Sequence, residues 1–165
     1  MNLVVYPSGV ANWNEQNFRC ALGAGGISKI KCEGDSITPA GKFSLRHVFF
    51  RADRIERPET VLPTTALTKI DGWSDDPDDP DYNRRITLPS TKRHEILWRT
   101  DAVYDLIVVI GYNDQPVVSG AGSAIFLHVA KAGYSSTEGC VAFMLSDLQK
   151  ILREWTETSV VDIQI

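Results

Sequence analysis

Short apolar stretches separated by turn residues constrain the fold of this chain most strongly. Four of them are rich in β-branched or aromatic residues and are bounded by glycine, proline or asparagine: residues 3–6, 43–50, 106–112 and 124–129. Runs of this length and composition are typical of buried strands. Near the C-terminus, Val161, Ile163 and Ile165 alternate with polar residues, which predicts a strand with one buried face.

One segment departs from the strand pattern. Apolar residues recur there at the spacing of one helix face: Leu148, Ile151, Leu152 and Trp155. Ser146 followed by Gln149 three residues later predicts a capping box at the start of this helix. The sequence therefore predicts a mainly β sandwich with a few short helices, one of which follows Cys140.

Composition sets the outer limits of function. With 165 residues and 43% hydrophobic residues, the chain fits one globular domain. The formal net charge is −4 and the basic residues are scattered, so no nucleic acid is expected as a partner. No apolar run approaches the roughly 20 residues of a membrane span. Residues 1–7 lack the charged and long apolar regions of a signal peptide.

His128 and Cys140 offer a base and a nucleophile. His128 lies near the end of an apolar run, and Cys140 follows Gly139 twelve residues later, so a strand end and a turn can converge. Cysteine attacks carbonyls as a thiolate, which at an unperturbed pKa is only about 3% of the population at pH 7. We therefore expect His128 to lower the pKa of Cys140. Spacing alone does not exclude structural roles, in which His128 is a packed side chain and Cys140 is a small residue at a tight turn.

The segment 126–141 resembles the catalytic signature of the L,D-transpeptidases of peptidoglycan, the YkuD-type domain. That family has a histidine, a loop and then Ser/Thr-x-Gly-Cys, and this chain has His128 and the Thr-Glu-Gly-Cys of residues 137–140. Residues 33–35 and 38–43 also resemble a strand and turn of the family. Ala142 differs, since many members carry arginine there. The resemblance covers most of the chain and implies a single YkuD-like β-sandwich domain over residues 1–165.

The resemblance implies acyl transfer through a cysteinyl thioester, without a cofactor. Cys140 would be the nucleophile and His128 the base, while backbone amides around Glu138 and Gly139 would stabilise the oxyanion. Thr137 would position the loop or the base.

The implied partners are peptidoglycan stem peptides, with carbapenem-type compounds as inhibitors, and the implied location is the periplasm or cell envelope. Ala142 in place of arginine suggests an acceptor amine other than that of the third-position diamino acid.

Other functions stay open at this stage. Attack by water would make the same chain an L,D-carboxypeptidase, and an amidase acting on stem peptides or a degenerate wall-binding domain are the further alternatives. Sortases separate His and Cys more widely, and papain-like peptidases place Cys before His.

The remaining motifs favour structural roles. Cys20 and Cys32 are predicted to be small buried thiols, with a disulfide as the alternative in an oxidising compartment. No metal-ligand spacing occurs, and the acidic segment 75–81 lacks the pattern of a calcium loop, so a solvated loop is expected. Residues 23–26 are expected to form a turn or bulge. His47 and His94 are interpreted as structural. Three aromatic residues could line a cleft or lie in the core: Trp73, Tyr82 and Tyr112.

Overall fold

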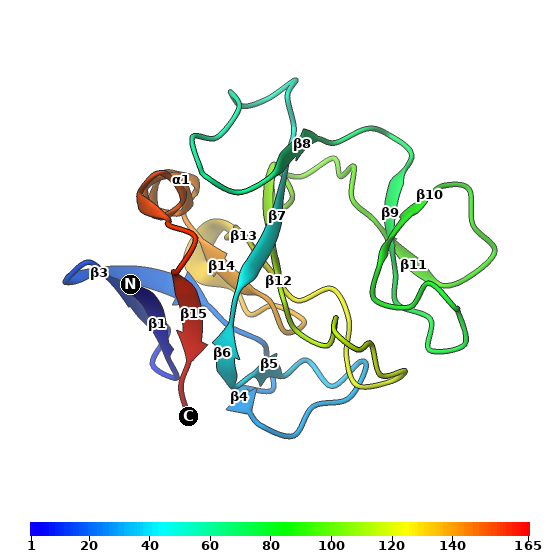
Figure 1. Cartoon of the computed structure of the whole chain (residues 1–165), viewed down its shortest axis with the longest axis horizontal. Coiled ribbons are helices and arrows are strands. Elements are labelled where there is room, and N and C mark those ends of the chain that lie inside the picture. Colours follow the sequence, from blue (N-terminus) through cyan, green and yellow to red (C-terminus); the bar gives the residue numbers. More distant parts are fainter.

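One curled sheet of ten strands forms most of the molecule (Figure 1). The computed structural model describes all residues from 1 to 165. Across the sheet the strands follow the order β6-β15-β1-β2-β3-β14-β13-β12-β7-β8. In chain order they are β1 (Asn2–Tyr6), β2 (Val10–Trp13), β3 (Gln16–Ala21), β6 (Gly41–Phe43), β7 (Leu45–Phe50), β8 (Thr64–Ala66), β12 (Leu106–Ile110), β13 (Phe126–Val129), β14 (Val141–Phe143) and β15 (Val160–Ile163). The predicted mainly β fold is confirmed.

Smaller elements flank this sheet. A three-stranded sheet has the order β10-β9-β11 and lies on the side away from the N-terminus (Figure 1). Its strands are β9 (Asp71–Ser74), β10 (Arg85–Thr87) and β11 (His94–Ile96). A two-stranded parallel sheet pairs β4 (Ile27–Ser28) with β5 (Thr38–Pro39). The helices are α1 (Leu145–Glu154) and one 3₁₀ turn, η1 (Ala132–Tyr134).

The curl lets the two halves of the large sheet share one core, as in a sandwich. Leu3 of β1 and Val161 of β15 lie in the same apolar cluster as Val108 of β12. Helix α1 adds its buried face to this cluster through Leu148 and Ile151. The amphipathic pattern of the helix is therefore explained by one apolar face packed against the sheet.

Strands β12 and β13 are buried on both faces. Leu106 and Val108 point into the main core, whereas Ile107 and Val109 belong to a second cluster with Trp73 of the small sheet. A strand covered on both sides needs apolar residues at every position, not at alternate ones. This is why residues 106–110 form an unbroken apolar run.

Two local predictions need correction. Residues 43–50 form two strands, because the chain leaves β6, which pairs with β15, and after Ser44 enters β7, which pairs with β12. The capping box is also absent: α1 already begins at Leu145, so Ser146 lies inside the first turn, and Met144 precedes the helix without a side-chain cap. The chain passes almost directly from β14 into α1, and the amide of Leu148 donates to the carbonyl of Met144.

Candidate active site

Two adjacent parallel strands bring the predicted nucleophile and base to one face of the sheet. In β13 and β14, Leu127 pairs with Val141 and His128 pairs with Ala142. Leu127 and Val141 point into the main core. Since side chains alternate along a strand, His128 and Cys140 both point to the opposite face. They are diagonal neighbours, with Cα atoms about 8 Å apart by ordinary strand spacing. Cys140 precedes the short strand β14 and not the helix directly, and the sequence patterns did not predict this strand.

A cleft of about 440 Å³ opens at this face. Both His128 and Cys140 line it, although only 6% of His128 and 7% of Cys140 is exposed. The residues of the loop before Cys140 line it as well: Ser135, Ser136, Thr137 and Glu138. Ala142 contributes to the wall next to His128. A substrate in this cleft would therefore contact the thiol, the imidazole and the loop together.

Cys140 is held as a neutral thiol. Its Sγ donates to the carbonyl of Ala124 at 3.2 Å and accepts from the amide of Phe126 at 3.4 Å. Burial raises the pKa of Cys140 to about 12, because the thiolate would lose its hydration. The expectation that His128 lowers this pKa is wrong for the unliganded protein, since no hydrogen bond joins the two side chains and desolvation dominates.

His128 is held as a neutral imidazole with a defined tautomer. Its Nδ1 lies 2.9 Å from the carbonyl oxygen of Val129, which can only accept, so Nδ1 carries the proton. Nε2 is then left with its lone pair. Burial lowers the pKa of His128 to about 4, and the ring of Tyr104 packs edge-on at 5.5 Å between centroids. The side chain is thus oriented to accept a proton.

The loop before Cys140 is fixed by Thr137. Its hydroxyl donates to the carbonyl of Cys140 at 2.6 Å and accepts from the amide of Gly139 at 3.1 Å. Gly139 has a φ of 134°, and a Cβ there would lie 2.8 Å from the carbonyl oxygen of Ile37. Only glycine fits this position without a shift of the backbone.

Two backbone amides at and near Cys140 make no hydrogen bond in the protein. The amide of Gly139 is occupied by Thr137, so this glycine contributes its conformation and not a free donor. The amides of Glu138 and Cys140 have no hydrogen-bond partner in the protein. Two free amides beside a nucleophile are the donors that an oxyanion requires.

Comparison with known proteins identifies the family of this chain. A family model described as the L,D-transpeptidase catalytic domain, YkuD, matches residues 2–163. The chain belongs to this family. No curated protein and no solved structure gives a significant match. Membership in an L,D-transpeptidase family points to acyl transfer on peptidoglycan stem peptides in the cell wall. No helix of this domain is long and apolar enough to cross a membrane.

Apart from Glu138, the charged residues of the L,D-transpeptidase cleft were not found from the sequence. Its cations are Lys31, Arg93, Arg99 and Lys131, and its carboxylates are Glu33, Asp75, Glu95 and Glu138. Most of the cations are already paired, but Lys131 has no ion pair. Most of these residues come from loops and short strands far apart in the chain, so no spacing or periodicity predicts them. Glu138 lies within the recognised motif, and Lys131 lies three residues after His128.

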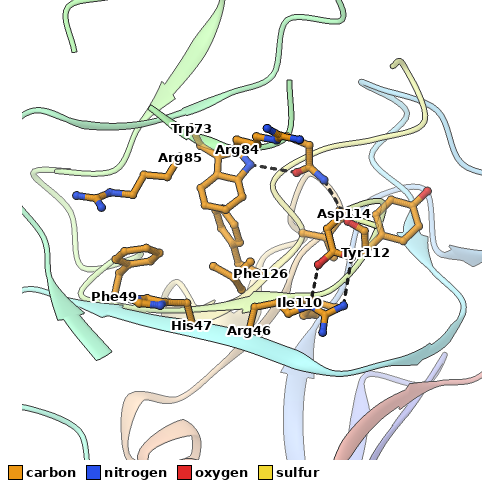
Figure 2. Close-up of a pocket in the computed structure, with 13 residues that line it drawn as sticks. Arg46, His47, Phe49, Trp73, Arg84, Arg85, Ile110, Tyr112, Asp114 and Phe126 are labelled. Carbon is orange, nitrogen blue, oxygen red and sulfur yellow. Dashed lines mark hydrogen bonds and ion pairs between the residues drawn. The ribbon is translucent and has the colours of Figure 1, made fainter. Parts of the chain in front are cut away.

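A second cavity of about 370 Å³ lies between the large and small sheets and contains no thiol (Figure 2). Trp73 and Phe126 form its apolar wall with their rings 5.0 Å apart, and the indole Nε1 of Trp73 donates to Asn83. Figure 2 shows Arg46 at its rim, paired with Asp114. Of the three aromatic residues named from the sequence, Trp73 and Tyr112 line this cavity and not the cleft, while Tyr82 is buried.

The other sequence motifs have local structural partners. His47 Nε2 lies 2.8 Å from the hydroxyl of Thr65, and the Nδ1 of His94 lies 2.7 Å from the carbonyl of Lys92. Residues 23–26 form the predicted turn, and the acidic segment 75–81 is a surface loop. All three cysteines are free; Cys20 is buried as expected, but Cys32 is exposed, so the prediction of a buried thiol is wrong for Cys32. No group of three His, Cys, Asp or Glu side chains is placed to hold a metal.

Proposed function

We propose that this chain is a peptidoglycan L,D-transpeptidase that crosslinks stem peptides through a thioester on Cys140, with His128 as the base. One observation carries the proposal: the thiol of Cys140, an imidazole whose Nε2 keeps its lone pair, and the two residues with free amides line the same cleft in a chain of this family. The same argument assigns Thr137 and Gly139 to positioning the loop. The cell envelope is the proposed location, because stem peptides are found there.

The first half-reaction forms the thioester. Nε2 of His128 takes the proton of the Cys140 thiol as Sγ attacks the carbonyl carbon of the donor peptide bond. The resulting oxyanion accepts hydrogen bonds from the amides of Glu138 and Cys140. The C–N bond then breaks, and the departing D-amino acid takes the proton from His128. Each amide donor of this kind is typically worth about 3 kcal/mol in the transition state.

The second half-reaction transfers the acyl group. The neutral amine of a second stem attacks the thioester carbonyl, and the C–S bond breaks. His128 moves one proton from the attacking nitrogen to the departing sulfur, so the enzyme returns to its neutral resting pair. Water can replace the amine, in which case the product is that of an L,D-carboxypeptidase.

A neutral resting pair fits this sequence of steps. Burial raises the pKa of Cys140 and lowers that of His128, so both groups are uncharged before substrate arrives. Proton transfer then accompanies attack, instead of preceding it as in a preformed ion pair. The free amides lower the free energy of the oxyanion at the moment when charge develops.

The test is product analysis with purified stem peptides. Cys140→Ala and His128→Ala are each expected to abolish crosslinked and hydrolysed products while the melting temperature stays near that of the wild type. Cys32→Ala, which removes an exposed thiol that does not itself line the cleft, is the matched control and should retain full activity. A carbapenem should add its mass to the peptide that contains Cys140.

Three results would contradict the proposal or redirect it. Crosslinking within tenfold of wild type in folded Cys140→Ala protein would exclude the thioester. Cleavage at a linkage other than the terminal L,D-bond would indicate an amidase. Stem-peptide binding without product and without a carbapenem adduct would indicate a degenerate wall-binding domain.

A further inference from the structure

A carboxyl group lies in the cleft beside the proposed nucleophile and is not used by the mechanism above. Glu95, the middle residue of β11, lines the same cleft as Cys140. The hydroxyl of Tyr104 donates to its Oε2 at 2.7 Å. The ring of Tyr104 packs edge-on against His128 with centroids 5.5 Å apart. Glu95 is therefore linked to the catalytic face through one tyrosine.

The other oxygen of this carboxyl group is free. Oε1 of Glu95 makes no hydrogen bond in the protein. Because every fully buried side-chain oxygen of the protein has a hydrogen-bond partner, Oε1 is not fully buried, and solvent in the cleft reaches it. Glu95 also has no ion pair, although Arg99 lines the same cleft. The guanidinium of Arg99 is instead held by both carboxylate oxygens of Asp101, at 2.8 and 2.6 Å.

The other carboxylates of the cleft differ from Glu95. Asp75 is paired with Arg93 at 3.1 Å. Glu33 accepts hydrogen bonds from the hydroxyls of Tyr82 and Ser123. Glu138 has an exposed side chain at the rim. Glu95 alone combines a fixed orientation, partial burial and an unoccupied oxygen, which is the arrangement that receives a cationic group from a ligand.

We propose that Glu95, oriented by Tyr104, forms the subsite for the acceptor amine, where it binds the incoming primary ammonium group and takes its proton. This inference rests on the proposed function, because the acceptor enters only after a thioester has formed. An alkylammonium group carries its proton at neutral pH and cannot attack a carbonyl until it loses it. His128 lies beside the thioester sulfur, so a second acceptor of protons is needed for this first deprotonation.

The electrostatic surroundings support proton transfer at this site. Burial raises the pKa of Glu95 to about 7, and the charges of Asp75 and Glu138 act in the same direction. Tyr104 and Arg99 act against this rise. Cys140 is neutral at rest, and burial keeps the pKa of Tyr104 well above its usual range, so Tyr104 stays a hydrogen-bond donor. A carboxylate with this pKa binds a cation and accepts a proton in the same pH range.

The step balances in atoms and charge. The N–H bond of the ammonium group breaks and an O–H bond forms on Oε1 of Glu95, which leaves a neutral amine and a neutral carboxylic acid. The amine attacks the thioester carbonyl, and its second proton passes through His128 to the sulfur of Cys140. Glu95 then releases its proton to solvent through the open cleft.

The experiment separates acylation from transfer in the protein of residues 1–165. Carbapenem adduct formation on Cys140 measures acylation alone, while a donor stem peptide with a primary-amine acceptor measures crosslinking against hydrolysis. Glu95→Gln keeps the shape and removes the charge, and Tyr104→Phe keeps the charge and removes the orienting hydrogen bond. Glu59→Gln removes one exposed negative charge, paired with Arg153, that does not line the cleft, and is the matched control.

In Glu95→Gln we expect acylation within twofold of wild type, crosslinking at least tenfold lower and hydrolysis retained. Tyr104→Phe should reduce crosslinking by a smaller factor, and Glu59→Gln should leave the ratio of crosslinking to hydrolysis within twofold. Hydroxylamine, which is uncharged at neutral pH, should accept the acyl group almost equally well in wild type and Glu95→Gln. The wild-type crosslinking rate should rise as pH passes through about 7, and this rise should vanish in Glu95→Gln.

Two results would overturn the inference while leaving the thioester mechanism intact. One is wild-type crosslinking in Glu95→Gln. The other is an equal loss of acylation and crosslinking in Glu95→Gln, which would make Glu95 a positioning residue of the catalytic pair. Failure of the proposed function looks different, since the wild type would then form no Cys140 adduct.

Discussion

Replacing Thr137 by valine tests the loop that presents the proposed oxyanion site. Valine keeps the shape of threonine but removes the hydroxyl, which donates to the carbonyl of Cys140 and accepts from the amide of Gly139. Each of these hydrogen bonds contributes about 1 kcal/mol net, so the free energy of unfolding should fall by about 2 kcal/mol. For a chain of 165 residues, that corresponds to a melting temperature lower by about 4–8 °C.

Thr137→Val should slow acylation even under conditions in which the variant is fully folded. The backbone of Thr137 stays bonded to Leu22 and Ala24, so the variant should fold with the loop in place but with its tip free to move. Acylation by a carbapenem should then slow by about tenfold or more, because misaligned amides lose part of their typical contribution. Thr137→Ser retains both bonds and is the control. Thr137→Val protein with wild-type acylation and a melting temperature unchanged within 1 °C would refute this reasoning.

Three further predictions follow from the geometry of the site. Gly139→Ala should lower the free energy of unfolding by about 1–3 kcal/mol, because alanine is strained at a φ of 134°. The variant should also acylate more slowly than the wild type, and a wild-type acylation rate would contradict the steric argument. Burial lowers the pKa of His128 to about 4 from 6.5, so the unfolded chain binds the proton first and the free energy of unfolding should fall as pH drops through this window. Denaturant titrations at pH 7.5 and 4.5 should show this loss of unfolding free energy, on the order of 3 kcal/mol, in wild type and not in His128→Gln. An equal loss in both proteins would contradict the role of His128. Iodoacetamide at pH 7 should modify exposed Cys32 well before Cys140, as peptide mass mapping can measure; the reverse order would show that Cys140 is already ionised.

The fold was predictable where burial leaves a strong local pattern. Residues 106–110 are apolar at every position because both faces of β12 are covered, and the face of α1 is marked by Leu148 and Ile151. Several short elements, β14 among them, escaped prediction. The turn between β2 and β3 places Asn14 and Glu15 at positive φ, and strands of three or four residues depend on distant partners more than on their own composition.

The candidate site was predictable only where its residues are close in the sequence. His128 and Cys140 stood out through a family motif, and the pairing of β13 with β14 explains why a spacing of twelve residues brings them to one face. The direction of their pKa shifts depends on burial, which the motif does not encode. Glu95 and Tyr104 meet because the chain folds back between β11 and β12, and nothing in the local sequence marks that contact.

The buried, neutral thiol of Cys140 has a consequence for covalent inhibitors. Electrophiles that depend on a standing population of thiolate would react first with exposed Cys32 and pass over Cys140. A compound selective for Cys140 must instead fill the cleft, present its carbonyl to the free amides and let His128 generate the nucleophile. Selectivity would then come from shape and hydrogen bonding, and screens for intrinsic thiol reactivity would select the wrong compounds.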